Sequence, residues 1–105
     1  MSMPDFKQLM QRAQQMQQKM AELQQELAAR TVEGHSGGGL VTAVVNGRQE
    51  LVSLHIAPQA VAGPDVELLE DLIVAAVQDA QKKAAAVAQE AMGALAGGLQ
   101  LPGLF

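Results

Sequence analysis

Ser53 and His55 are the neighbouring side chains in this sequence that could act as a nucleophile and its base. They stand two residues apart in a predicted strand, so both point to the same face of a sheet. A serine nucleophile also requires an acid that orients the histidine and an oxyanion site within a pocket. A small sheet with one face in solvent provides neither, so the pair predicts exposed polar side chains without catalysis.

The remaining residues that could bind a metal ion or a phosphate group do not have the spacing of a known binding site. The chain has two histidines and no cysteine, so it has no ligand set for a structural zinc ion and no disulfide. Five acids lie in residues 65–79, without the alternating Asp/Asn–Gly pattern of a calcium loop. The glycines of residues 36–39 are not followed by the Lys-Ser/Thr of a phosphate-binding loop. We therefore predict no enzyme activity and no metal, cofactor or small-molecule substrate.

Charged residues are unevenly distributed along the chain. The formal net charge of −4 argues against a generic coat on nucleic acid. Residues 7–21 nevertheless contain three cations (Lys7, Arg12 and Lys19) and no acid, whereas residues 65–79 contain no cation. Arg12, Lys19 and Glu26 are each a heptad apart, along one edge of a helix. Such charges are either solvated and paired with charges on another helix, or they form a row of phosphate contacts. Both interpretations stay open.

The segment without acids belongs to a long helix predicted at residues 5–30. Its apolar residues recur at spacings of three and four, in the order Phe6, Leu9, Ala13, Met16, Met20, Leu23 and Leu27. This is a heptad stripe. Eight glutamines and no Gly, Pro or Thr lie in residues 6–30, in agreement with helix propensity. A helix of roughly 37 Å cannot bury such a stripe on its own, so the stripe predicts a partner.

Residues 31–57 carry the pattern of a three-stranded antiparallel sheet. A strand is predicted at residues 30–35, where the sequence changes to β-branched residues and glycine, and two more at residues 40–45 and 49–56, where apolar residues alternate. Asn46-Gly47 is the strongest hairpin signal, and it predicts a type I′ turn in which both central residues have positive φ. One face of the sheet is expected to be covered, and an edge strand could pair with a second copy. The residues expected on apolar faces are Val41, Ala43, Val45, Val52, Leu54 and Ile56.

A second long helix is predicted at residues 64–92, opened by Gly63-Pro64-Asp65. Its apolar face is expected to pack on the sheet, and this face consists of Val66, Leu69, Leu72, Ile73, Ala76, Val77 and Ala80. Lys82 and Lys83 follow Asp79 by three and four residues, so at least one of them is expected to pair with it. Gly93 is predicted to end the helix and to leave a flexible apolar tail, residues 93–105, which is free or docks onto a hydrophobic groove.

The length and composition place these elements in one domain, residues 1–105. The fold class is α+β, in the order long helix, three-stranded antiparallel sheet, long helix. Two long helices leave a small core, so oligomerisation is expected. No apolar run approaches about 18 residues and no basic-then-apolar leader is present, which favours a soluble cytoplasmic protein without membrane contact. The two aromatic residues, Phe6 and Phe105, form no platform for stacking bases.

Eight short segments follow one another with a specific order and spacing over nearly the whole chain. They are Leu-Met at 9–10, Gln-Gln-Met-Gln-Gln-Lys-Met at 14–20, Gly-Gly-Leu-Val at 38–41, Val-Asn-Gly at 45–47, Leu-Glu-Asp-Leu-Ile-Val-Ala-Ala at 69–76, Asp-Ala at 79–80, Gly-Gly at 97–98 and Leu-Pro-Gly-Leu-Phe at 101–105. Together they resemble the YbaB/EbfC family of small bacterial nucleoid-associated DNA-binding proteins.

The resemblance implies a homodimer whose sheets and cores join while paired helices project like tweezers. It implies that these helices bind double-stranded DNA in the nucleoid and affect nucleoid organisation and gene expression, without a cofactor. The family's basic positions correspond to Arg12, Lys19, Lys82 and Lys83, with Lys7 as an addition. Since the chain is poor in cations and stacking aromatics, we expect little sequence preference. The alternative is a dimeric structural or protein-interaction module for which DNA contact is incidental.

Overall fold

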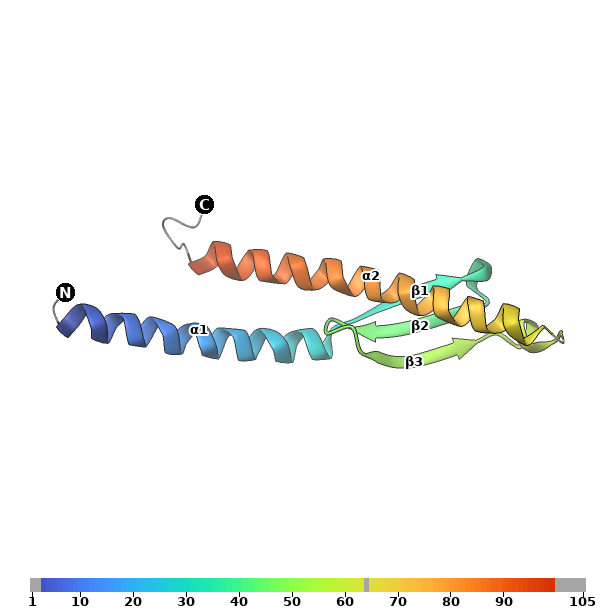
Figure 1. The fold of residues 1–105 in the computed structure, drawn as a ribbon, viewed down its shortest axis with the longest axis horizontal. Helices are drawn as coiled ribbons and strands as arrows, with labels where there is room; N and C mark the ends of the chain where they lie inside the picture. Colours follow the sequence, from blue (N-terminus) through green and yellow to red (C-terminus); the bar gives the residue numbers. More distant parts are fainter. Residues whose placement is uncertain (1–2, 64, 100–105) are drawn as a thin grey trace.

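The computed structural model describes residues 3–63 and 65–99. It confirms the predicted α+β order of a long helix, three strands and a second long helix (Figure 1). Short 3₁₀ turns at Gly37–Gly39 and Pro58–Val61 join the elements. The helices and strands are α1 (Met3–Ala29), β1 (Thr31–Ser36), β2 (Val41–Asn46), β3 (Leu51–Ile56) and α2 (Val66–Leu99).

The three strands form one antiparallel sheet in the order β1-β2-β3. On the central strand β2, Val41, Ala43 and Val45 are fully buried, while the intervening Thr42 and Val44 are partly exposed on the other face. This alternation confirms the predicted face of the strand. The buried side chains lie beneath α2 and form the core.

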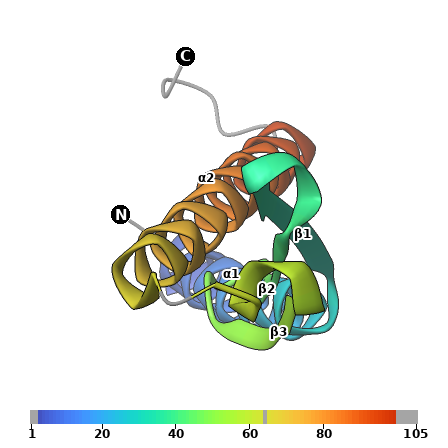
Figure 2. The same cartoon turned by 90° about the vertical axis from the view of Figure 1, so that its right-hand side faces the viewer.

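Helix α2 packs closely across β1 and β2 (Figure 2). Its buried residues Ala76, Ala80 and Ala84 recur every four positions and present only methyl groups to the sheet. A Cβ atom at Gly34 on β1 would overlap the backbone of Ala76 and Ala80. The glycine and the alanines therefore set the short distance between the helix and the sheet. Leu69, Leu72, Ile73 and Val77 flank this contact as predicted, whereas Val66 is exposed.

Strand β3 lies at the edge of the sheet, and its apolar side chains Leu51, Val52 and Leu54 are all exposed. The predicted alternation of Val52 with Leu54 and Ile56 is interrupted. The register steps from Val44–Ser53 to Val45–Leu51, so Val52 has no partner on β2 and the strand contains a bulge. The strand also begins at Leu51 rather than at residue 49. One edge of the sheet is therefore apolar and is left exposed by the described residues.

The turn between β2 and β3 differs from the predicted type I′ turn. In this turn only Gln49 has a positive φ, 66°, and the backbone N–H of Asn46 donates to the carbonyl of Glu50 at 2.9 Å. The side-chain Oδ1 of Asn46 accepts the N–H groups of Arg48 and Glu50 at 2.9 and 3.0 Å. The loop thus has three residues with the last one left-handed, a common alternative to the two-residue turn.

Gly47 is required in this turn for a different reason from the predicted one. Its N–H lies 2.7 Å from the carbonyl oxygen of Leu27 and 2.9 Å from that of Arg30. A Cβ at position 47 would lie 2.8 Å from the same Leu27 oxygen. The last turn of α1 approaches so closely that only glycine fits.

Helix α2 ends at Leu99, beyond the predicted end at residue 92. The expected tail at residues 93–99 is therefore helical, and residues 100–105 lie outside the described part of the chain. An exposed glycine costs a helix about 1 kcal/mol relative to alanine. The residues after Gly93 offset this cost, because Ala94, Leu95 and Ala96 are good helix formers and Leu95 is partly buried. The prediction that the helix ends at Gly93 was therefore wrong.

The heptad stripe of α1 is buried at one end of the helix only. Leu27 is 5% exposed and Leu23 8%, Met20 and Met16 are intermediate, and Leu9 is 57% exposed. The molecule extends over 73 × 23 × 17 Å, with a radius of gyration of 20.5 Å, against about 13 Å for a compact domain of similar length. Within one chain, α1 thus projects away from the core with much of its apolar stripe uncovered (Figure 1).

Candidate nucleic-acid interface

The predicted cations of α1 are exposed on the projecting helix. Lys7, Arg12 and Lys19 all have exposed side chains, and no acid lies in residues 7–21. Twelve residues of helix span about 18 Å, a length comparable to several phosphates along one strand of a duplex. This part of α1 is therefore a positive, glutamine-rich rod that a phosphate backbone can approach.

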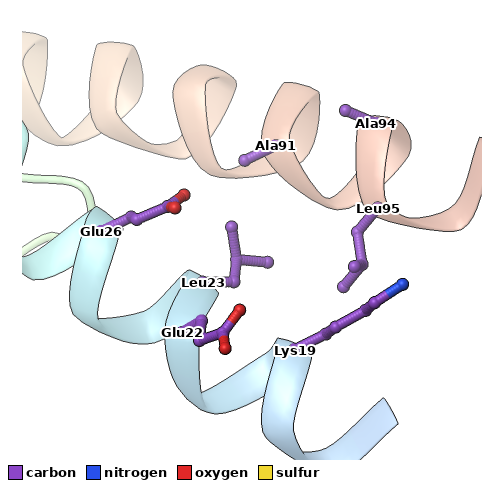
Figure 3. Close-up of a pocket in the computed structure, with 7 residues that line it drawn as sticks. All are labelled: Lys19, Glu22, Leu23, Glu26, Ala91, Ala94 and Leu95. Carbon is purple, nitrogen blue, oxygen red and sulfur yellow. The ribbon is translucent and has the colours of Figure 1, made fainter. Parts of the chain in front are cut away.

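Lys19 also lines a groove between α1 and α2 with a volume of about 430 Å³ (Figure 3). Leu23 points from α1 toward α2, and Leu95 points back from α2. Two acids of α1, Glu22 and Glu26, line the same groove. Neither acid was predicted to line a groove. The spacing of three and seven residues from Lys19 was the available signal, because such residues share a helix face.

Lys83 is engaged in contacts that join α2 to β1. Its Nζ lies 3.1 Å from Oδ2 of Asp79 and donates to the carbonyl oxygen of Glu33 at 3.1 Å. The backbone N–H of His35 donates to the same Asp79 oxygen at 3.1 Å. The His35 N–H and the Lys83 ammonium together lower the pKa of Asp79 below its ordinary value. This confirms the expected pairing of Lys83 with Asp79. Lys83 thus also holds α2 to β1 through the carbonyl of Glu33.

Lys82, the neighbour of Lys83, is exposed on α2. The five predicted site residues therefore occupy two places in the fold. Three follow one another along α1, and two lie on α2 between the buried Ala80 and Ala84, where the helix crosses the sheet. Of the two lysines on α2, Lys83 is the one held by an ion pair and Lys82 is the one with no such contact in the described residues.

The acids at the start of α2 lie at the opposite end of the long axis from the start of α1 (Figure 1). Asp65 caps the helix, since its Oδ1 accepts the N–H of Leu68 at 2.9 Å. Glu67, Glu70 and Asp71 follow with exposed side chains. The protein is thus electrostatically polarised, with acids at the start of α2 and cations without acids on the projecting part of α1.

The outer face of the sheet carries the histidines. His35, Thr42 and His55 lie opposite one another across the three strands, and His35 Nδ1 is 3.1 Å from Thr42 Oγ1. Ser53 and His55 are exposed. In residues 3–63 and 65–99, no three His, Cys, Asp or Glu side chains are grouped to hold a metal ion. None of the helices in this part of the chain is long and apolar enough to cross a membrane.

Comparisons with known proteins agree with this geometry. The sequence profile of the YbaB/EbfC DNA-binding family matches residues 3–99. A nucleoid-associated protein of Syntrophobacter fumaroxidans is 52% identical over 95 residues, which cover 90% of this chain and 86% of that protein. A nucleoid-associated protein of Pelotomaculum thermopropionicum is 52% identical over 97 residues, 92% of each chain. One from Rhodococcus erythropolis is 52% identical over 103 residues, covering 96% of this chain and 92% of the relative.

A solved structure shares the fold. The crystal structure of an uncharacterized protein from Helicobacter pylori superposes with a TM-score of 0.60 at 25% sequence identity, covering 83% of this chain and 96% of that one. The family match extends over nearly all described residues, and the relatives share half of their residues with this chain over almost their full length. The chain therefore belongs to the YbaB/EbfC DNA-binding family.

Proposed function

We propose that this protein binds double-stranded DNA in the nucleoid as a homodimer, through the exposed cations and glutamines of α1 together with the exposed Lys82 of α2. The observation that carries the proposal is the projecting part of α1, where Lys7, Arg12 and Lys19 have exposed side chains and residues 7–21 contain no acid. The names of the relatives, which are nucleoid-associated proteins, support the same location.

The dimer is proposed to form at the uncovered edge of the sheet. Leu51, Val52 and Leu54 on β3 are exposed, and an apolar edge strand with unpaired backbone groups favours pairing with another strand. A second copy at this edge would bury these side chains. It would also double every cation, so that two α1 helices act on one duplex.

The binding is proposed to have little sequence preference and no catalytic step. Lysine and arginine on a helix surface neutralise phosphates, and these contacts position a protein without reading bases. The glutamines of α1 add hydrogen bonds to phosphates or to base edges. By coating or joining duplexes in this way, the protein would affect nucleoid organisation and gene expression.

Salt dependence of binding tests the proposal. Lys7, Arg12, Lys19 and Lys82 are eight cations in a dimer, and if half of them contact phosphates, log K against log[salt] should have a slope of about −4. The measurement uses the full chain, a duplex of arbitrary sequence and a parallel determination of mass in solution. A dimer with this slope on unrelated duplexes supports the proposal, and a folded dimer that ignores DNA at low salt contradicts it.

A pair of charge reversals locates the interface. Arg12→Glu should weaken binding by roughly tenfold or more, because it places two acids on the proposed DNA-facing surface of the dimer. Arg48→Glu makes the same change in charge on the exposed turn after β2 and is expected to have a much smaller effect. Equal effects of the two variants, with the dimer intact, would place the contact elsewhere.

The second candidate is a dimeric structural or protein-interaction module. The net charge of −4 and the exposed apolar residues of α1 and β3 favour it. In that case DNA binding would be weak, insensitive to Arg12→Glu, and lost at modest salt, while the dimer persists.

A further inference from the structure

Two side chains of α2 contact the backbone of β1 along its outer edge. Nζ of Lys83 donates to the carbonyl oxygen of Glu33 at 3.1 Å, and Oδ2 of Asp79 accepts the N–H of His35 at 3.1 Å. The same Nζ and Oδ2 atoms lie 3.1 Å apart as an ion pair. The ion pair and the two hydrogen bonds thus form one connected group between the helix and the strand.

The two backbone groups lie on the side of β1 that faces away from β2. The strand is at the edge of the sheet, and successive residues of an antiparallel strand alternate between bonding to the neighbour and pointing away from it. Since the N–H of His35 is donated to Asp79, the backbone groups of residues 33 and 35 point outward. Glu33 and His35 are therefore the residues through which another strand would pair with β1.

The ion pair has the hydrogen-bonding pattern of a neighbouring strand. One residue of an added parallel strand would donate its N–H to the carbonyl of Glu33 and accept the N–H of His35 with its own carbonyl. Lys83 supplies that donor, and Asp79 supplies that acceptor. An added strand would lie about 4.8 Å from β1, in the space that the ends of these two side chains occupy.

The position of the ion pair follows from the alanines that pack on the sheet. Asp79 and Lys83 each precede a buried alanine, Ala80 and Ala84, by one residue, so both lie on the same flank of the contact face. The close approach of α2 over Gly34 brings a side chain as short as that of aspartate within reach of the strand. The packing that holds the helix on the sheet therefore also places the pair at the β1 edge.

The two edges of the sheet differ in what they offer to a partner strand. Along β3, Leu51, Val52 and Leu54 are exposed, which favours pairing with another strand. Along β1, the exposed side chains of Glu33 and His35 lie 3.7 Å apart, and charged side chains are a common protection of edge strands. The β3 edge is thus open to a partner, whereas side chains occupy the β1 edge.

We propose that the Asp79–Lys83 pair takes the place of a fourth strand on β1 and thereby prevents a second copy of the chain from pairing at that edge. Side chains that are 41% and 49% exposed gain little stability from their ion pair alone, so the main effect of the pair is on the two backbone groups that it occupies.

The pair would also limit the size of the assembly, and this consequence rests on the proposed dimer. If the β3 edges of two copies join, the two β1 edges are the ends of the combined sheet. Closing both ends stops further strands from adding. The assembly then contains two copies and does not grow into a longer array.

A double substitution that leaves the net charge unchanged tests the closed edge. Asp79→Ala with Lys83→Ala frees the carbonyl of Glu33 and the N–H of His35. The mass in solution should rise with concentration to about twice the wild-type mass or more, because each copy then offers a second edge for pairing. Asp71→Ala with Arg48→Ala is the matched control. It also removes one acid and one cation, from exposed positions away from β1, and should keep the wild-type mass.

A proline at position 35 closes the edge again by a different means. Proline has no N–H, and it is tolerated on edge strands where that group would point outward. His35→Pro added to the double substitution should therefore return the mass to that of the wild type. Lys83→Met replaces the double substitution if that variant does not fold, because it keeps the stem of the side chain and removes only the donor to Glu33.

The outcomes separate an opened edge from general instability. Growth of the assembly that His35→Pro reverses, with the circular dichroism spectrum of the wild type, supports the proposal. An unchanged mass, or growth that His35→Pro does not reverse, overturns it. Equal growth in Gly47→Ala, whose contact is with Leu27 rather than at the β1 edge, would also overturn it. A monomeric wild type would contradict the proposed dimer, while the change from wild type to variant still decides whether the pair closes β1.

Discussion

The N–H of Gly47 and the carbonyl oxygen of Leu27 lie 2.7 Å apart, and this contact joins the turn after β2 to the last turn of α1. The carbonyl groups at the end of a helix lack partners within the helix, so the turn satisfies one of them. Asn46 holds the turn in place through Glu50 and Arg48. Helix α1 is thus attached to the sheet at its C-terminal end.

Gly47→Ala should destabilise the protein by about 2 kcal/mol or more, because its Cβ would press on the backbone of Leu27. Urea unfolding followed by circular dichroism measures the change. Gly63→Ala is the control, since a Cβ there meets no atom within 4 Å, and its effect should stay within about 0.5 kcal/mol. Equal stabilities for the two variants would mean that α1 is not held at this turn.

Gly93→Ala should lengthen the lifetime of the last turns of α2. The residue is inside the helix, a Cβ there meets no atom within 4 Å, and alanine favours a helix over glycine by about 1 kcal/mol. Far-UV circular dichroism should show more helix on heating, and amides in residues 93–99 should exchange more slowly. A loss of helix on this substitution would contradict the extension of α2 to Leu99.

Acid should weaken the contact between α2 and β1 through Asp79. The His35 N–H and Lys83 lower the pKa of Asp79 from its ordinary value of 3.8. The contribution of a carboxyl group with a lowered folded-state pKa is complete above its unfolded pKa and is lost as the pH falls through the folded one. Asp79→Asn should therefore be less stable at neutral pH and lose less stability below pH 3.8. Asp71→Asn, an exposed acid on the same helix, should keep the wild-type pH profile, and identical profiles for all three proteins would argue against the contact.

Lys82 and Lys83 should separate into a DNA contact and a structural contact. Under the proposed function, Lys82→Ala should reduce the magnitude of the salt slope by about two in a dimer and leave thermal unfolding unchanged. Lys83→Ala should lower the unfolding midpoint, because it removes the ion pair with Asp79 and the donor to Glu33, and should change the slope less. The reverse pattern would exchange the two roles.

Patterns within a single element were reliable guides for α1 and β2, but not for β3, where a bulge interrupts the predicted alternation. The heptad spacing of α1 and the alternation of Val41, Ala43 and Val45 depend on the residues of one segment, and both are present as predicted. The pairing of Lys83 with Asp79 also follows from spacing along one helix. The other partners of this pair, Glu33 for Lys83 and His35 for Asp79, are more than forty residues away in the sequence, and no local rule contains them.

The wrong predictions arose where a distant segment decides the local conformation. Gly47 was interpreted as a turn residue that needs positive φ, whereas the structure requires glycine because Leu27 lies behind it. Gly93 was interpreted as a helix end, yet α2 continues because Leu95 in the next turn packs beside α1. The positions of the five cations on their helices followed from sequence, while their separation into two places required the fold.

Helix α2 contacts the sheet most closely where Ala76 and Ala80 lie over Gly34. A change in the helix–sheet distance at this contact would tilt the whole helix about it. The helix is supported by the core up to Ala84, and the remaining residues to Leu99 form an arm of about 22 Å. A tilt of α2 by about 10° at this contact would move Leu99 by about 4 Å, because the arm is about 22 Å long. The small residues at the sheet thereby determine the distance between the N-terminal end of α1 and the C-terminal end of α2. A larger side chain at position 34 would push α2 away from the sheet and change that distance.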